Sequence, residues 1–224
     1  MGREDRRYVH LGGLKEIGLQ ARVEDQRIEA ALAARLMAGD GSAFDEFVER
    51  FRTKIFRYSF LNCGQRDEAE EVAQETLLKV FQKFDQLQEP AHVKAWVFRI
   101  AKNACLERRR RSVFAPEREL SLDELRPGAK DDGRGLKFEV TDLRIGPEQE
   151  AYHGELHRMV EEEVRELPEA YRSVLLLRDR EELPAKEVAE VLEISEDLVR
   201  TRLHRARLAV RKGVEARLRA RGAR

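Results

Sequence analysis

The sequence is poor in the residues from which metal, disulfide and membrane sites are built. Its 224 residues include two cysteines and one tryptophan, and Cys63 and Cys105 have neither the spacing of zinc ligands nor that of a disulfide framework. His153 and His157 lack further ligand types nearby, so no metal site is predicted. No apolar run approaches the roughly 18 residues of a membrane span, and the N-terminus lacks a signal-peptide core. These absences predict a soluble, cytoplasmic protein that does not insert into membranes and needs no cofactor.

A recognisable catalytic constellation is also missing. An enzyme acting on nucleic acid needs clustered carboxylates or a nucleophile–base pair in a cleft. The sequence has no glycine-rich phosphate loop and no convincing metal cluster. We therefore predict that the protein is not an enzyme.

The chain has no net charge overall, but its charges are unevenly distributed along the sequence. The chain holds 43 basic and 43 acidic residues. Residues 198–224 nevertheless carry ten basic residues against Glu215 alone, whereas residues 155–197 carry fourteen acidic and six basic residues. Such separation costs self-repulsion within each stretch, so an external polyanion is the natural counterpart of the basic one.

Apolar residues recur at steps of three and four along most of the chain, which predicts helices. Proline and glycine interrupt this pattern between residues 113 and 150, where "LKFEVTDL" (136–143) is compatible with a short strand or an extended segment. We predict an all-α fold of two small helical domains joined by a long flexible linker. The predicted boundaries are 1–26 for an N-terminal extension, disordered or a regulatory arm, 27–112 for the first domain, 113–150 for the linker and 151–224 for the second domain. A single bundle with a long loop is the alternative, although structureless loops of this length are unusual in a compact domain.

Residues 183–212 have the pattern of a helix-turn-helix. "LPAKEVAEVLEIS" (183–195) predicts a short helix and a turn, with Ser195 as the N-cap of the next helix. The predicted buried stripe of that second helix is Val199, Leu203, Ala206, Val210 and Val214. Its other side carries arginines, Thr201 and His204. A basic helix presented in this way fits the major groove, where arginine can donate two hydrogen bonds to guanine.

The first domain carries two contrasting stretches. "DEAEEVAQE" (67–75) has five acidic residues and no basic one, and Glu71, Gln74 and Glu75 share an exposed face. Because an acidic patch repels DNA, we expect this face to meet a basic protein. "WVFRIAKNACLERRRR" (96–111) has six basic residues and one acidic residue. A basic helix with an aromatic residue at its start suits single-stranded nucleic acid, since rings stack on unpaired bases, although Trp96 could instead be a core residue.

Four segments together carry a resemblance to a known family. They are "LMAGDGSAFDEFVERFRTKIFRYSFLNCG", "DEAEEVAQETLLKVFQKFD", "AWVFRIAKNACLERRRR" and "LPEAYRSVLLLRDREELPAKEVAEVLEISEDLVRTRLHRARLAVRK". In this order and spacing they resemble the extracytoplasmic-function (group IV) sigma factors of bacterial RNA polymerase. The resemblance implies a sigma region 2-like bundle, followed by a sigma region 4-like helix-turn-helix domain.

The resemblance also implies partners and roles. Core RNA polymerase would be contacted at its flap and at the clamp helices of its largest subunit, the clamp helices by Glu71, Gln74 and Glu75. The first domain would melt the −10 element of promoter DNA through Trp96, Arg99, Asn103, Arg108 and Arg109. The second would read the −35 element through Arg200, Thr201, Arg202, His204 and Arg205. The loop 86–93 would receive a flipped base, the linker would run through the RNA channel of the polymerase, and an anti-sigma factor would be a further partner.

These implications predict a factor that directs core polymerase to promoters and initiates transcription without catalysing a reaction. The alternative is a conventional helix-turn-helix regulator that binds duplex DNA unaided. That alternative leaves the acidic face of residues 67–75 unexplained.

Overall fold

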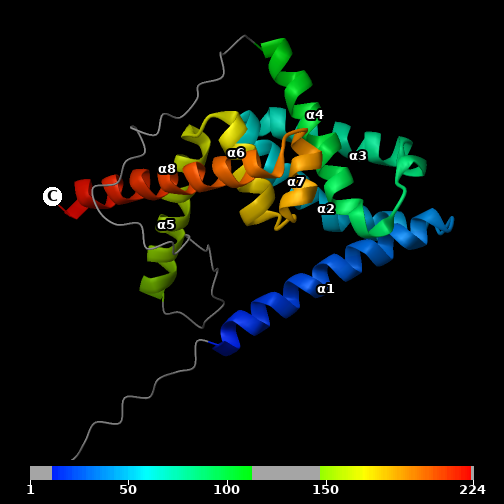
Figure 1. Ribbon diagram of the computed structural model, residues 1–224, viewed down its shortest axis with the longest axis horizontal. Coiled ribbons are helices and arrows are strands. Elements are labelled where there is room, and N and C mark those ends of the chain that lie inside the picture. The colour runs from blue at the N-terminus through cyan, green and yellow to red at the C-terminus, as the bar shows by residue number, and fades with distance from the viewer. Residues whose placement is uncertain (1–11, 113–146, 223–224) are drawn as a thin grey trace, which may run out of the picture.

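The computed structural model describes the backbone of residues 12–112 and 147–222 and the side chains of residues 23–108 and 154–220. Within these ranges all regular secondary structure is helical, which confirms the prediction of an all-α fold (Figure 1). The segment 136–143, for which a strand or an extended conformation was expected, lies outside the described residues.

The N-terminal half is built around α2. Its elements are α1 (Gly12–Met37), α2 (Ala43–Cys63), α3 (Arg66–Gln82), the 3₁₀ turns η1 (Phe84–Gln86) and η2 (Pro90–His92), and α4 (Val93–Ser112). Phe47, Phe51 and Ile55 lie on one side of α2 and are fully buried. Gly64 ends this helix at a φ of 84°, and its N–H donates to the carbonyl of Phe60 at 3.0 Å. This left-handed conformation, which glycine adopts without strain, turns the chain into α3.

The C-terminal half is a second set of helices. It consists of α5 (Pro147–Glu166), α6 (Glu169–Leu175), a π-helical continuation η3 (Leu176–Arg180), α7 (Ala185–Leu192) and α8 (Glu196–Gly222). Pro168 and Pro184 immediately precede α6 and α7. A proline restrains the backbone in a way compatible with a helix start, and its missing N–H is not needed there.

Helix α1 changes the predicted organisation of the N-terminus. Residues 12–26, predicted as part of an extension that is disordered or a regulatory arm, form the first part of α1, so the boundary predicted at residue 27 falls inside a helix. The later turns of α1 are anchored by buried Leu32 and Ala33. Asp25 forms an ion pair with Arg50 of α2, which extends the contact toward the N-terminus. A helix propagates from a packed segment at little cost, and the weak pattern of residues 12–26 gave no sign of it.

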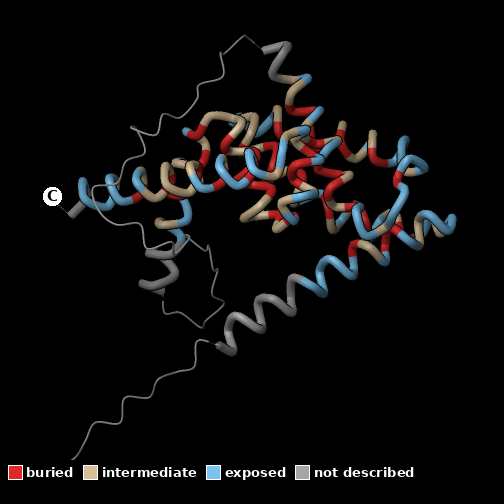
Figure 2. The backbone as a smooth tube through the Cα atoms, in the orientation of Figure 1, coloured by how far each residue is buried: buried red, intermediate tan, exposed pale blue. Residues whose placement is uncertain are grey.

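The two halves pack against each other within one continuous hydrophobic core. Helix α4 lies along α7, and α2 contacts α5 and α6. Figure 2 shows the buried residues concentrated where these helices cross, whereas the C-terminal end of α8 is mostly exposed. The described residues therefore form a closed arrangement of the two halves.

Candidate nucleic-acid and protein interfaces

The end of α7 and the start of α8 form the predicted helix-turn-helix. Glu193 follows α7 in the left-handed conformation, at a φ of 57°, and the Ile194 N–H donates to the carbonyl of Ala189 at 3.0 Å. The Ser195 hydroxyl accepts a hydrogen bond from the Leu198 N–H at 3.2 Å. This is the N-cap that the sequence predicted, and it starts α8 directly after the turn.

Helix α8 presents two different sides over its first turns. The five predicted core positions are all buried, namely Val199, Leu203, Ala206, Val210 and Val214. The predicted DNA residues Arg200, Thr201 and His204 are exposed, and Arg202 and Arg205 are half-buried. The helix thus leaves a polar, largely cationic side in solvent next to a buried apolar stripe.

Arg200 is held by acidic residues of its own helix. Its guanidinium lies 2.6 Å from Asp197 Oδ1 and 3.2 Å from Glu196 Oε2. The Thr201 hydroxyl donates to the Asp197 carbonyl at 2.9 Å. Ion pairs between exposed side chains contribute little to stability, so a phosphate or a base edge can compete for this arginine.

Other cations of α8 have internal partners, which corrects the interpretation of the basic surplus. Arg207 Nε lies 2.8 Å from Asp179, and this hydrogen bond raises the pKa of the guanidinium. Arg217 forms ion pairs with Glu162 and Glu163 of α5. Because α8 crosses α5 and η3, part of the surplus faces the acidic residues 155–197 rather than an external polyanion.

The acidic face of α3 is exposed as predicted, but it is not purely acidic. Glu71 and Gln74 are exposed and Glu75 is half-buried. Leu78 and Phe81 continue the same helical face and are 56% and 61% exposed. These two apolar residues were not among those predicted for this face. The sequence contains a signal for them: each is adjacent in sequence to an apolar residue of the buried side of α3. This helix therefore has more apolar residues than its buried side alone needs.

Two residues predicted to contact different partners contact each other. Glu71, assigned to the polymerase surface, forms an ion pair with Arg108 of α4, which was assigned to DNA. Glu75 lies 2.7 Å from Lys79, which also reaches Glu107 of α4 at 3.0 Å. The pairs Glu71–Arg108 and Lys79–Glu107 thus link α3 to α4, so the two predicted surfaces are neighbours.

The predicted single-strand-binding side of α4 divides into a packed and an exposed part. Trp96 is half-buried against the core and meets Phe84 edge-to-face, with ring centroids 5.8 Å apart. Arg99 and Asn103 are exposed. The side chain of Arg109 lies outside the described residues. Trp96 therefore packs against the core and also keeps part of its side chain accessible.

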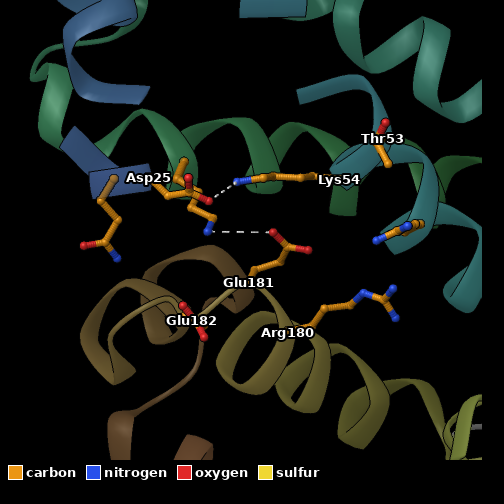
Figure 3. A pocket seen from close by; sticks show the side chains of 9 residues that line it. Asp25, Thr53, Lys54, Arg180, Glu181 and Glu182 are labelled. Carbon is orange, nitrogen blue, oxygen red and sulfur yellow. Dashed lines mark ion pairs between the residues drawn. The ribbon is translucent and has the colours of Figure 1, made fainter. Parts of the chain in front are cut away.

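A polar cavity of about 350 Å³ lies at the junction of the two halves. Its lining comes from α1, α2, α4 and the segment around η3, and consists of Asp25, Gln26, Thr53, Lys54, Arg57, Lys94, Arg180, Glu181 and Glu182. In Figure 3 the carboxylate of Glu181 points from the C-terminal half toward the N-terminal half, and Lys94 Nζ lies 3.8 Å from it. Across the described ranges, no three histidine, cysteine or acidic residues are grouped as metal ligands would be.

The fold and surfaces define a helical protein with a helix-turn-helix, a separate basic helix and an exposed acidic and apolar face on α3. The family description Sigma-70 region 2 matches residues 33–113, and Sigma-70, region 4 matches residues 157–210. The ECF RNA polymerase sigma factor SigW of Bacillus subtilis is 29% identical over 174 residues, which cover 78% of this chain and 90% of SigW. The ECF RNA polymerase sigma-E factor of Haemophilus influenzae is 27% identical over 191 residues, covering 85% and 97%. The chain belongs to the extracytoplasmic-function sigma factors of the sigma-70 family.

Solved structures agree on the fold. CnrH, in a complex with the cytosolic domain of CnrY, superposes with a TM-score of 0.54 at 22% identity, over 86% of this chain and 97% of that one. The sigma factor RpoE of Bartonella quintana, in complex with the anti-sigma factor NepR, has the same TM-score at 16% identity, over 77% and 96%. None of the helices in residues 12–112 and 147–222 combines the length and apolarity of a bilayer-crossing segment.

Proposed function

We propose that this chain directs core RNA polymerase to specific promoters, with residues 27–112 and 151–224 acting as separate recognition units. The observation that carries the proposal is the exposed start of α8, placed as the second helix of a helix-turn-helix directly after the Ser195 cap. The function of its relatives, named as RNA polymerase sigma factors, is consistent with this role. The protein acts by binding and does not catalyse a reaction.

The −35 element is the proposed ligand of α8. Arg200, Thr201 and His204 share its exposed side, and Arg202 and Arg205 flank it. Arginine can make paired hydrogen bonds to guanine in the major groove, whereas a hydroxyl or imidazole can contact a base edge or a phosphate. The buried stripe on the opposite side holds this face outward.

The −10 element is the proposed ligand of α4. Arg99 and Asn103 are exposed one turn apart, and the ring of Trp96 is partly accessible beside them. Such a surface can stack on an unpaired base while a guanidinium contacts the backbone. Arg108 and Arg109 follow on the same helix, and Arg108 must exchange its partner Glu71 for a phosphate to take part.

Core polymerase is the proposed partner of the α3 face. Glu71, Gln74 and Glu75 offer negative and polar groups, and Leu78 and Phe81 add exposed apolar area. An apolar centre bordered by charge is typical of protein interfaces, in which a few large side chains supply most of the affinity. The same partner would place the protein in the cytoplasm.

An anti-sigma factor is a second proposed protein partner. RpoE of B. quintana, which shares the fold, was captured with such a protein. Because the two halves pack together, we expect the anti-sigma factor to compete with polymerase for the exposed side of α3 and with DNA for that of α8.

The test combines promoter recognition with polymerase binding. We expect Arg200→Ala with Arg205→Ala to reduce the preference for a promoter with an intact −35 element by roughly tenfold or more, because each lost paired contact contributes about 1–3 kcal/mol of discrimination. Run-off transcription with core polymerase on intact and scrambled −35 templates measures that preference. Arg219→Ala, also on α8 but 83% exposed near its C-terminal end, is the matched control. Unchanged discrimination, or a loss of polymerase binding instead, would contradict the assignment of α8.

A further inference from the structure

The two cysteines of the chain meet in the N-terminal half, although 42 residues separate them in sequence. Cys63 is the last residue of α2, and Cys105 lies on α4. Their Sγ atoms are 3.7 Å apart, and both are free thiols. The fold thus places the two thiols of the chain close enough for a reaction that involves both of them.

The surroundings allow the sulfur atoms to approach further. A disulfide bond is about 2.0 Å long, so the gap needs to close by less than 2 Å. Cys105 sits on a packed helix and is 7% exposed. Cys63 is the last residue of α2 and is followed by Gly64, where the chain turns in the left-handed conformation. We therefore expect Cys63, rather than Cys105, to supply most of the movement that brings the two sulfur atoms together.

The two thiols also differ in reactivity. Cys63 is half-buried and therefore reachable by a small molecule. The hydrogen bond with Cys105 lowers the pKa of the Cys63 thiol, and the positive charge of Arg108 lowers it further. Burial and the negative charge of Glu68 act in the opposite direction. The same hydrogen bond and burial raise the pKa of Cys105. A thiolate is the reactive form of cysteine, so Cys63 is the attacking sulfur and Cys105 is the resolving one.

We propose that Cys63 and Cys105 form a thiol-oxidation site, at which a hydroperoxide converts the pair into an intramolecular disulfide between α2 and α4. The Cys63 thiolate attacks one peroxide oxygen and the O–O bond breaks. The departing hydroxide takes a proton to become water, and Cys63 becomes a sulfenic acid. The Cys105 sulfur then attacks the Cys63 sulfur, the S–O bond breaks, and the hydroxide leaves as water with the Cys105 proton. Two thiols and one hydrogen peroxide thus give one disulfide and two waters.

The position of this bridge connects two functional regions. Asn62, the neighbour of Cys63, accepts a hydrogen bond from Arg172 of the C-terminal half through its carbonyl, at 3.0 Å. Arg108, one turn after Cys105, forms the ion pair with Glu71 on the α3 face. Oxidation therefore cross-links the point where the C-terminal half docks to the helix that carries the proposed −10 residues.

Peptide mapping of the full chain tests the proposal. Reduced protein is treated with hydrogen peroxide at neutral pH, alkylated without reductant and digested with trypsin. We expect peptides 58–66 and 103–108 to appear as one disulfide-linked species, two alkylatable thiols per chain to be lost, and dithiothreitol to restore both. The oxidised chain should stay monomeric, and its thermal midpoint should rise because the bridge restricts the unfolded chain.

Two single variants test the order of events. In Cys105→Ser, Cys63 should still be oxidised and be trapped as a sulfenic acid by dimedone, with no rise in the thermal midpoint. In Cys63→Ser, Cys105 should remain a thiol at the same peroxide dose. The proposal would be overturned if the wild-type chain gave only intermolecular dimers or sulfonic acids, with peptides 58–66 and 103–108 unlinked. Equal oxidation of Cys105 in Cys63→Ser and in the wild type would overturn the assigned roles.

Discussion

Glu181 is a carboxylate whose surroundings depend on how the two halves pack. It is 4% exposed, and burial raises its pKa to about 7. Lys94, Lys54 and Arg180 act in the opposite direction, whereas Glu29 adds to the increase. Lys94 and Lys54 belong to the N-terminal half, so the protonation of Glu181 is coupled to the junction that the cavity borders (Figure 3).

At the residue scale, we expect Glu181→Gln to change the pH dependence of stability. A glutamate in the unfolded chain loses its proton near pH 4.5, whereas folded Glu181 keeps it until about pH 7. Between these values the folded state binds more protons, so the contribution of Glu181 to the free energy of unfolding falls as pH rises and is constant above that window. Glutamine resembles the protonated side chain, so the variant should be more stable than the wild type at pH 8, by on the order of 2 kcal/mol, and equal to it at pH 4.5.

Urea unfolding of the wild type and the variant between pH 4.5 and pH 8 measures this difference. Glu166→Gln, an exposed position on α5, is the control and should follow the wild-type profile. Parallel profiles for Glu181→Gln and the wild type would mean that the carboxylate is not buried in solution.

At the element scale, α3 combines a buried side with an exposed face that is both acidic and apolar. Val72, Ala73 and Val80 are buried, whereas Leu78 and Phe81 extend into solvent. Phe81 is not loose, because its ring meets Phe44 of α2 edge-to-face with centroids 4.9 Å apart. A large apolar side chain that is already oriented loses little conformational freedom on binding, which favours it as an anchor.

We expect Phe81→Ala and Glu75→Lys each to weaken binding of core polymerase, by about tenfold or more for Phe81, since truncating an anchor residue costs about 1–3 kcal/mol. Glu75 is a better choice than Glu71, because its partner Lys79 keeps a second ion pair with Glu107, whereas reversing the charge at Glu71 removes the ion pair between Glu71 and Arg108. Fluorescence anisotropy of labelled protein titrated with core polymerase measures the affinity. Glu166→Lys, a charge reversal on α5, should bind as the wild type does, and equal affinities for all variants would rule out the α3 face.

At the scale of the whole molecule, the halves are joined by contacts of opposite charge. Beside Lys94 and Glu181, Lys102 of α4 lies 3.2 Å from Glu193, and a hydrogen bond of 3.1 Å adds a polar contact between the His92 ring and Glu187 of α7. Acidic residues of the C-terminal half thus face lysines of α4. The proposed recognition of two separated promoter elements would require the halves to move apart, so we expect this junction to open when polymerase binds.

Arg172 is the residue whose loss should loosen the junction most. Its guanidinium donates to the carbonyls of Leu61 and Asn62 at 2.9 and 3.0 Å, and to that of Leu167 in its own half at 2.8 Å. The last carbonyls of a helix have no intrahelical partner, so a cation at the end of α2 is favourable. Charge-assisted hydrogen bonds contribute about 1.5–3 kcal/mol, and Arg172→Met removes them while keeping an apolar stem.

We expect Arg172→Met to shift the chain toward an open form, with a larger radius of gyration in small-angle scattering. The distance between dyes on α3 and on α8, measured by energy transfer, should also increase. Arg158→Ala, exposed on α5, should leave both values unchanged. If Arg172→Met remains as compact as the wild type, the Arg172 contacts do not hold the halves together.

Local pattern was sufficient for much of the fold and for part of the site. The stripe from Val199 to Val214 is buried as predicted, and Ser195 caps α8, because helical periodicity and capping depend on neighbouring residues alone. The helical character of residues 12–26 was missed, because their local pattern is weak and they continue a helix that is packed only in its later turns, at Leu32 and Ala33. The exposure of Phe81 was missed for the related reason that periodicity does not tell which apolar residues lie beyond the core.

The sequence by itself determined the helical class, the helix-turn-helix and the exposed side of α8, since each follows from the order of residues along one helix. Only the tertiary structure decided which charges neutralise each other. It paired Arg207 with Asp179 and Glu71 with Arg108, and it brought Cys63 to Cys105. The physical reason is that electrostatic and sulfur contacts act over a few ångströms in space, and their partners lie on helices that are distant in sequence.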